Sequence, residues 1–188
     1  MRRRSLLLGL ALSGCAAPPP PPDRVMLAPD LAFTLPPPAT LGRSLAVAHL
    51  VTARWQGREV SFEGQIEAGA GRFRLAVLDP LGRRALTVVW DAAGLRAEKS
   101  KDFPDDLRPA NLLADLVVIY WPAPALRRAL APAELRESAA GREVWWKGQP
   151  IIRLERQEGG ARLRYANLAF GYTLDIRAVA SGTAGEGA

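Results

Sequence analysis

Few residues of this chain combine a reactive side chain with a spacing that chemistry needs. The one histidine, His49, lies in an apolar stretch, where a hydrogen-bonded structural imidazole is a better interpretation than a base or a metal ligand. Gly69 and Gly71 begin like a dinucleotide-binding loop, but the strand pattern that follows favours a hairpin turn. The pair Asp105 and Asp106 is typical of a helix cap. We therefore expect no metal and no cofactor.

Nucleophilic catalysis also lacks its usual sequence signals. No Gly-x-Ser-x-Gly sequence occurs, so a lipase-like serine centre would lack the turn that normally presents it. An enzyme would instead need a nucleophile such as Ser61 or Ser138, and neither has an evident base nearby in the sequence. We expect that the protein is not an enzyme.

The first residues have the pattern of a secretory signal peptide. Three arginines at 2–4 precede an apolar stretch at 5–12 that is too short to span a bilayer. The stretch ends in Leu12-Ser13-Gly14-Cys15, which resembles the lipobox of bacterial lipoproteins. The resemblance implies removal of residues 1–14 and attachment of diacylglyceryl and N-acyl chains, such as palmitate, to Cys15. An ordinary signal peptide with a chance cysteine is the alternative.

A lipid anchor of this kind also predicts a location. Two or more acyl chains hold a protein on a membrane stably, whereas a single chain does not. In the Gram-negative lipoprotein pathway an aspartate after the cysteine retains the product in the inner membrane, but here Ala16 and Ala17 follow. The resemblance therefore implies attachment to the periplasmic face of the outer membrane.

The basic charge does not indicate a nucleic-acid partner. Loss of the signal peptide removes three arginines and no acidic residue, which lowers the formal charge from +6 to +3. The remaining arginines are spread singly along the chain, as on a solvated surface.

Composition divides the mature chain into a tether, a domain and a tail. Residues 15–42 are rich in proline and predict an extended, lipid-anchored tether. The apolar segments 25–27 and 31–33 within it could pack on the domain, which the sequence leaves open. Residues 43–179 have the size of one domain, which we expect to be monomeric. The small and polar residues 180–188 predict a disordered tail.

Alternation of apolar and polar residues predicts antiparallel strands in both halves of the domain. In the segment 72–78, for example, Phe73, Leu75 and Val77 alternate with Arg72 and Arg74. Short connections that contain glycine should pair successive strands as hairpins. The predicted strands are 44–55, 59–67, 72–78, 84–91, 95–99, 142–146, 150–157, 162–168 and 172–179.

Helical spacing replaces this alternation in the middle of the domain. Pro109 suits a first helical turn, and apolar residues recur at helical spacing from Leu112 to Tyr120. A second short helix is expected at 124–130. A large sheet with so few helices should curl around them. The sequence therefore predicts a mainly β protein with α, in which a single curled antiparallel sheet forms a partly open half β-barrel with a short helical lid in its mouth.

Several segments of the domain resemble LolB, the outer-membrane lipoprotein receptor. They are residues 72–82, with the sequence Asp79-Pro80-Leu81-Gly82 at their end, and residues 125–130. Residues 111–116 and 120–122 resemble more closely a family of LolB-like lipoproteins of unassigned function, sometimes encoded near genes for fatty-acid and aryl-polyene synthesis. The resemblance implies a LolA/LolB-like fold and a periplasmic LolA-like carrier as a partner.

The most specific part of that resemblance is the loop that carries Leu81. The matching loop of LolB carries an exposed leucine that is needed to deliver lipoproteins into the membrane, which implies membrane contact for Leu81. The alternative is an ordinary turn whose leucine folds back on the core, because Pro80 and Gly82 suit any tight turn. A proline-rich tether stands where LolB has an N-terminal helix, so the resemblance leaves the arrangement of the lid and the identity of the cargo open.

The LolB-like architecture further implies an apolar cavity that binds lipid or the acyl chains of lipoproteins. A solid core made of the same residues is the alternative, and it would suit a structural or adaptor lipoprotein of an envelope assembly or of a lipid or aryl-polyene pathway. The candidate cavity residues are Phe62, Phe73, Leu75, Val77, Leu86, Val88, Trp90, Leu113, Leu116, Val117, Trp121, Trp146, Leu154, Leu163 and Tyr165.

Overall fold

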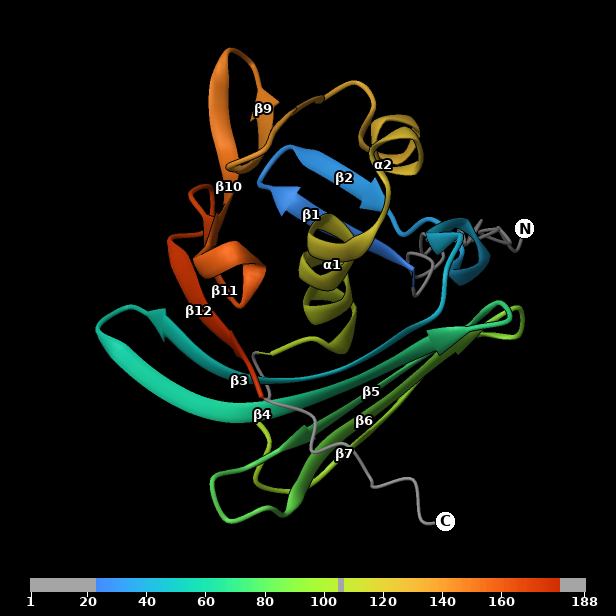
Figure 1. Ribbon diagram of the computed structural model, residues 1–188, viewed down its shortest axis with the longest axis vertical. Coiled ribbons are helices and arrows are strands. Elements are labelled where there is room, and N and C mark those ends of the chain that lie inside the picture. The colour runs from blue at the N-terminus through green and yellow to red at the C-terminus, as the bar shows by residue number, and fades with distance from the viewer. Residues whose placement is uncertain (1–22, 105–106, 180–188) are drawn as a thin grey trace, which may run out of the picture.

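A computed structural model describes residues 23–104 and 107–179, and it is mainly β with two short α-helices. A large antiparallel sheet curls around helix α1 and is not closed into a barrel (Figure 1). Cys15 and the predicted signal peptide lie outside the described residues, as do Asp105, Asp106 and the predicted tail at 180–188. The prediction of a partly open, mainly β fold with a curled sheet is therefore confirmed.

Ten strands form the main sheet in the order β7-β6-β5-β4-β3-β12-β11-β10-β9-β8, with all neighbours antiparallel. They are β3 (Leu45–Trp55), β4 (Arg58–Gly69), β5 (Arg72–Leu78), β6 (Arg84–Asp91), β7 (Gly94–Lys99), β8 (Glu134–Ser138), β9 (Gly141–Trp146), β10 (Gln149–Gln157), β11 (Arg162–Asn167) and β12 (Tyr172–Ala178). All the predicted strands are present, and β8 is an additional one.

The strand order explains why the helices lie inside the curve. Each half of the domain is a run of hairpins, and the last strand, β12, joins the halves by pairing with β3. The edges of the sheet are consequently β7 and β8, which are also the strands before and after the helical segment. The helices therefore connect one edge of the sheet to the other, and α1 lies against the concave face (Figure 1).

Helix α1 (Pro109–Tyr120) is buried along most of its length, with Leu113, Val117 and Val118 almost inaccessible to solvent. The expected lid is therefore wrong: α1 is an element of the core, because a helix that is apolar on most sides has to be buried. Its N-cap position is Arg108, so the expected cap by Asp105 or Asp106 is wrong too. Helix α2 (Ala123–Leu130) follows close to its predicted position.

The predicted tether is too long. Residues 24–34 form a two-stranded hairpin of β1 (Arg24–Ala28) and β2 (Leu31–Thr34), and a 3-10 turn, η1, covers Pro38–Leu41. Leu27 and Phe33 are almost fully buried, and the hairpin packs beside α1 and α2 (Figure 1). The apolar segments within the proline-rich stretch thus complete the core.

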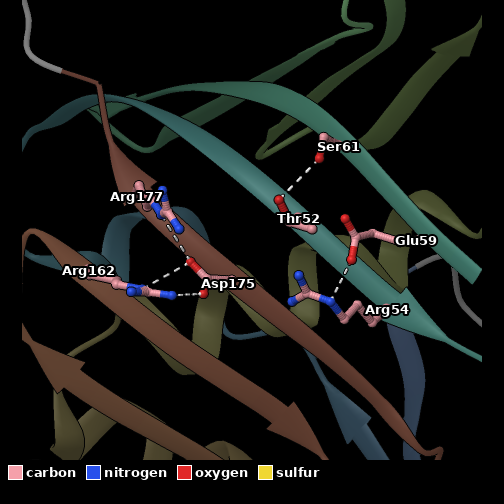
Figure 2. A network of polar contacts seen from close by, with 7 residues as sticks. All are labelled: Thr52, Arg54, Glu59, Ser61, Arg162, Asp175 and Arg177. Carbon is pink, nitrogen blue, oxygen red and sulfur yellow. Dashed lines mark hydrogen bonds and ion pairs between the residues drawn. The ribbon is translucent and has the colours of Figure 1, made fainter.

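The sheet has one apolar and one polar face, as the alternation predicts. On β3, His49 and Val51 are buried on the concave face, while Leu50 between them is exposed. The outer face carries a network of polar contacts across four strands, drawn in Figure 2: Thr52, Arg54, Glu59, Ser61, Arg162, Asp175 and Arg177. This face is therefore hydrated rather than packed against a second layer.

Within the described residues, no helix is both long and apolar enough to span a membrane.

Candidate functional site: an apolar cavity beside helix α1

A cavity of about 450 Å³ lies between α1 and the concave face of the sheet. Its walls come from β1, β3, β4, β5, β6, β11, β12, the segment before α1 and the first turns of α1 itself. This volume is within the usual range for sites that bind small molecules. Because α1 is buried against strands from both halves of the sheet, the wall of the cavity is part of the folded core rather than a loose flap.

The cavity is partly open to solvent. The exposed residues around that opening are Met26, Arg54, Val60, Ser61, Pro80, Asp102, Pro104, Arg108, Asn111 and Phe170. Three of them, Met26, Val60 and Phe170, are large apolar side chains with 40–46% of their surface exposed. An apolar rim next to charged groups suits a ligand with a long apolar part and a polar end.

The inner end of the cavity is different, because it is polar. Asp115 on α1 and Asn167 at the end of β11 are both buried lining residues, with 4% and 2% of their surface exposed. The hydroxyl groups of Tyr165 and Tyr172 both donate hydrogen bonds to Asp115 Oδ1, at 2.6 and 2.7 Å. Three elements thus place one carboxyl group at the floor of an otherwise mostly apolar space.

Burial controls the protonation of this carboxyl group. Desolvation raises the pKa of Asp115 to about 7, against the smaller opposite effect of the two tyrosine hydrogen bonds. Burial also raises the pKa of both Tyr165 and Tyr172, so both remain hydrogen-bond donors. The floor of the cavity therefore holds a carboxyl group that changes charge near neutral pH.

A second, smaller cavity of about 50 Å³ adjoins the first and shares five lining residues with it: Phe62, Val77, Leu112, Asp115 and Leu174. His49 and Tyr120 line its other side and form a hydrogen bond between the imidazole Nε2 and the phenol oxygen. Desolvation lowers the pKa of His49, which favours the neutral ring. The interpretation of His49 as a buried, hydrogen-bonded imidazole fits this geometry.

Four of the predicted cavity residues, Phe62, Leu75, Val77 and Leu116, do line these two cavities. Others pack in the hydrophobic core and line neither cavity: Phe73, Leu86, Val88, Trp90, Leu113, Val117, Trp121, Leu154, Leu163 and Tyr165. Trp146 lies elsewhere, where its indole nitrogen donates to Asp30 at 3.0 Å. Placing these residues in the cavity was wrong.

One feature of the fold explains why these predicted cavity residues lie in the core instead. The apolar faces of β1, β2 and α1 fill most of the space inside the curled sheet, and Phe73, Trp90 and Trp121 pack against one another there as an aromatic cluster. The Trp121 indole donates to Thr40 of η1 at 2.9 Å. The β1–β2 hairpin and η1, which belong to the predicted tether, therefore fill part of the space that the sequence predicts as a ligand cavity.

Leu81 has 78% of its surface exposed, so the alternative in which it folds back on the core is wrong. Asp79 holds the loop by accepting hydrogen bonds from the backbone nitrogens of Leu81 and Arg83, each at 2.9 Å. Gly82 has a φ of 75°, which favours glycine at this point of the turn. Because Asp79 and Pro80 also line the large cavity, Leu81 stands on a fixed loop at its opening.

Features that catalysis would need are few around this site. Ser61 lies on the rim, and its hydroxyl shares a hydrogen bond of 3.1 Å with Thr52 (Figure 2). Ser138 is exposed at the end of the edge strand β8. Across residues 23–104 and 107–179, no three His, Cys, Asp or Glu side chains gather in a way that could hold a metal ion.

Residues 46–180 match the family described as "Protein of unknown function (DUF3261)". The chain belongs to that family. The match covers the sheet from β3 to β12 together with both helices, but not the β1–β2 hairpin. A search of the curated proteins finds no match. The family's description assigns no activity, so the cavity carries the functional argument for this DUF3261 protein.

Sequence reasoning missed Asp115 as a site residue. The signal available was a single carboxylate inside an apolar helical stretch, between Leu112 and Ile119. An unpaired charge is costly in such a position unless other elements supply hydrogen bonds. Its partners, Tyr165 and Tyr172, lie about 50 residues further along the chain, and only the pairing of β11 with β12 brings them together.

Proposed function

We propose that this protein binds an elongated apolar ligand, of the class of lipid or lipoprotein acyl chains, in the cavity beside α1. The observation that carries the proposal is the cavity itself: about 450 Å³, partly open to solvent and lined mostly by apolar side chains. Burying a methylene group in such a space contributes about 0.8 kcal/mol. The burial of its methylene groups would therefore stabilise a bound acyl chain.

The proposal includes a place of action. In it, the acyl chains on Cys15 anchor the protein to the periplasmic face of the outer membrane, and Leu81 contacts the bilayer during transfer of the ligand. What supports this step is the arrangement of the loop, since Leu81 is held outward beside the opening where Met26 and Phe170 are also exposed. A LolA-like periplasmic carrier would be the partner that delivers or receives the ligand.

The half-barrel of the LolA/LolB type is part of the same proposal. A curled, open antiparallel sheet with a helix inside the curve agrees with it, and so does a cavity between that helix and the sheet. The second candidate, a non-catalytic adaptor lipoprotein, expects a solidly packed interior, so the cavity favours ligand binding over it.

A cavity-filling variant tests ligand binding. Ala53 lines the cavity on β3, and Ala53→Phe places a phenyl ring in the space that an acyl chain would occupy. We expect it to weaken the binding of a fluorescent acyl probe, dansyl-undecanoic acid, at least about tenfold, because several methylene contacts are lost. Titration of the purified protein with the probe measures this change.

The matched control is Ala46→Phe on the same strand. Ala46 is exposed on the outer face, so the same added volume should leave the affinity for the probe unchanged. If the probe does not bind the unaltered protein saturably, or if both variants bind it equally well, the proposed function is wrong. Protein partners that co-purify without lipid would then support the adaptor function.

A further inference from the structure

Asp115 and Asn167 form the polar floor of the cavity, and the binding of a plain acyl chain does not require this floor. A methyl end that reached Asp115 would leave a buried carboxyl group facing hydrocarbon, and an unmatched buried polar group opposes binding. The floor should therefore discriminate among apolar ligands by what they carry at the end that enters first.

The two carboxyl oxygens of Asp115 have different surroundings. Oδ1 accepts hydrogen bonds from both Tyr165 and Tyr172, while Oδ2 accepts none from the described residues. Asn167 fixes this arrangement from β11, because its Nδ2 donates to the Tyr172 oxygen at 3.5 Å and its Oδ1 accepts from the Phe170 backbone nitrogen at 3.0 Å. The carboxyl group is thereby oriented, with one oxygen left for a group inside the cavity.

We propose that Asp115, oriented by Tyr165 and Tyr172, binds a hydroxyl group at the leading end of an apolar ligand, so that the preferred ligands are hydroxylated acyl chains or apolar alcohols. This inference rests on the proposed function, because it concerns the selectivity of the same cavity. Tyr165 and Tyr172 are positioning residues in it, and Asp115 Oδ2 is the contact to the ligand.

A hydroxyl group fits this floor better than a charged group. It can donate to an ionised carboxylate and accept from a protonated carboxyl, so it pairs with Asp115 in both states. A ligand carboxylate would be repelled once Asp115 ionises, and a buried ammonium would need a carboxylate that stays ionised, whereas burial raises the pKa of Asp115 to about 7.

The other charged and titratable groups near the cavity do not alter this choice. Tyr165 and Tyr172 face Asp115 directly, and His49 and Tyr120 line the smaller cavity beside it. Two further charged lining residues have partners outside the cavity, since Asp79 pairs with Arg83 in the Leu81 loop and Arg54 pairs with Glu59 on the outer face of the sheet (Figure 2). The charged lining residues Asp102 and Arg108 are exposed at the opening, so they face the other end of a bound ligand. A fatty acid that enters with its hydroxyl end first would leave its carboxylate among them.

Competition among three ligands of equal chain length tests the inference on the full purified chain. Palmitate, ω-hydroxypalmitate and ω-aminopalmitate each displace dansyl-undecanoic acid, and the displacement gives their affinities. We expect ω-hydroxypalmitate to bind about tenfold or more tightly than palmitate, which is the effect of one hydrogen bond to a buried carboxyl group.

Each other outcome has a distinct meaning. Equal affinities for palmitate and ω-hydroxypalmitate overturn the hydroxyl site but leave the proposed function intact. Tighter binding of ω-aminopalmitate than of ω-hydroxypalmitate also overturns it, in favour of a cation site. If none of the three binds, the proposed function fails together with the inference.

Two variants assign the preference to Asp115. Asp115→Leu should abolish the preference for the hydroxylated chain while it leaves the binding of palmitate as tight or tighter. Glu67→Leu removes an exposed carboxylate from the outer face of β4, away from the cavity, and should retain the preference. A preference that survives Asp115→Leu overturns the inference, and the ligand comparison on the unaltered protein decides the matter if that variant does not fold.

Discussion

Asp115 and Asp79 are two aspartates that each accept hydrogen bonds from neighbouring groups, yet their pKa values move in opposite directions. Asp79 lies on the exposed loop, where hydrogen bonds from the Arg83 backbone and side chain lower its pKa. Asp115 lies in the core, where desolvation raises its pKa to about 7 despite two tyrosine donors. Hydrogen bonding dominates the pKa of the exposed Asp79, whereas desolvation dominates the pKa of the buried Asp115.

A prediction for stability follows from the raised pKa of Asp115. Between about pH 4 and about pH 7 the unfolded chain has released this proton while the folded protein still holds it. The contribution of Asp115 to the free energy of unfolding is therefore largest in acid and falls as the pH rises, by up to about 1.4 kcal/mol per pH unit within this window. Urea unfolding at several pH values, compared with Asp115→Asn, measures it.

The Asn variant is the matched control, because its amide oxygen can still accept from both tyrosines but does not titrate. We expect it to be less stable than the unaltered protein near pH 4, or equal to it, and to gain on it as the pH rises. The comparison isolates Asp115 from groups such as Asp79 and Asp175, whose lowered pKa values have the opposite effect on stability. Parallel stability curves for the two proteins would disprove a raised pKa.

At the scale of elements, the C-terminal end of α1 has to satisfy its carbonyl groups inside the core. Arg142 on β9 does so: its Nη1 donates to the carbonyl oxygens of Val118 and Trp121, at 2.9 and 2.7 Å. Its Nε donates to Glu137 of β8 at 2.6 Å. One buried guanidinium thus ties the helix that walls the cavity to the second half of the sheet.

Arg142→Gln should therefore destabilise the protein by about 3 kcal/mol, because it leaves buried carbonyls and the Glu137 carboxylate without their partner. The control is Arg96→Gln, which also removes an ion pair, at 2.7 Å to Asp91, but from a side chain that is half exposed. That change should cost less than about 1 kcal/mol. Equal urea midpoints for the two variants would contradict the role given to Arg142.

At the scale of the whole molecule, the opening of the cavity and Leu81 lie together on the folded body. The β1–β2 hairpin also belongs to that body, so any tether before it is limited to the residues preceding Asp23, which the structure does not describe. In the proposed function, a short tether from Cys15 keeps the opening near the membrane surface.

Membrane contact by Leu81 predicts that Leu81→Asp weakens binding to vesicles of phosphatidylethanolamine and phosphatidylglycerol about tenfold, since a leucine inserted in a bilayer contributes about 1.5–3 kcal/mol. Sedimentation of the protein without its acyl anchor measures this binding. Leu50→Asp is the control, because Leu50 is also exposed but lies on the outer face of β3. Loss of vesicle binding in both variants, or in neither, would contradict the proposed membrane contact by Leu81.

Local pattern predicted much of the fold. The alternation in β5 and β6 and the helical spacing from Leu112 to Tyr120 each reflect which face of a single element is buried, and this information is contained within a few residues. The prolines at 36–38 favoured the prediction of an extended tether, although Leu27 and Phe33 in the same stretch are buried in the core. The short edge strand β8 has only Leu135 buried, so its alternation was too weak to detect.

The sequence by itself determined which side of each predicted strand is apolar, where the helices lie along the chain, and that Leu81 stands in a tight turn between two strands. The tertiary structure alone decided which apolar residues fill the core and which line a cavity, because that depends on the volume that β1, β2 and α1 occupy inside the sheet. It also decided the environment of Asp115, since the pairing of β12 with β3 and β11 brings distant tyrosines to one buried carboxyl group.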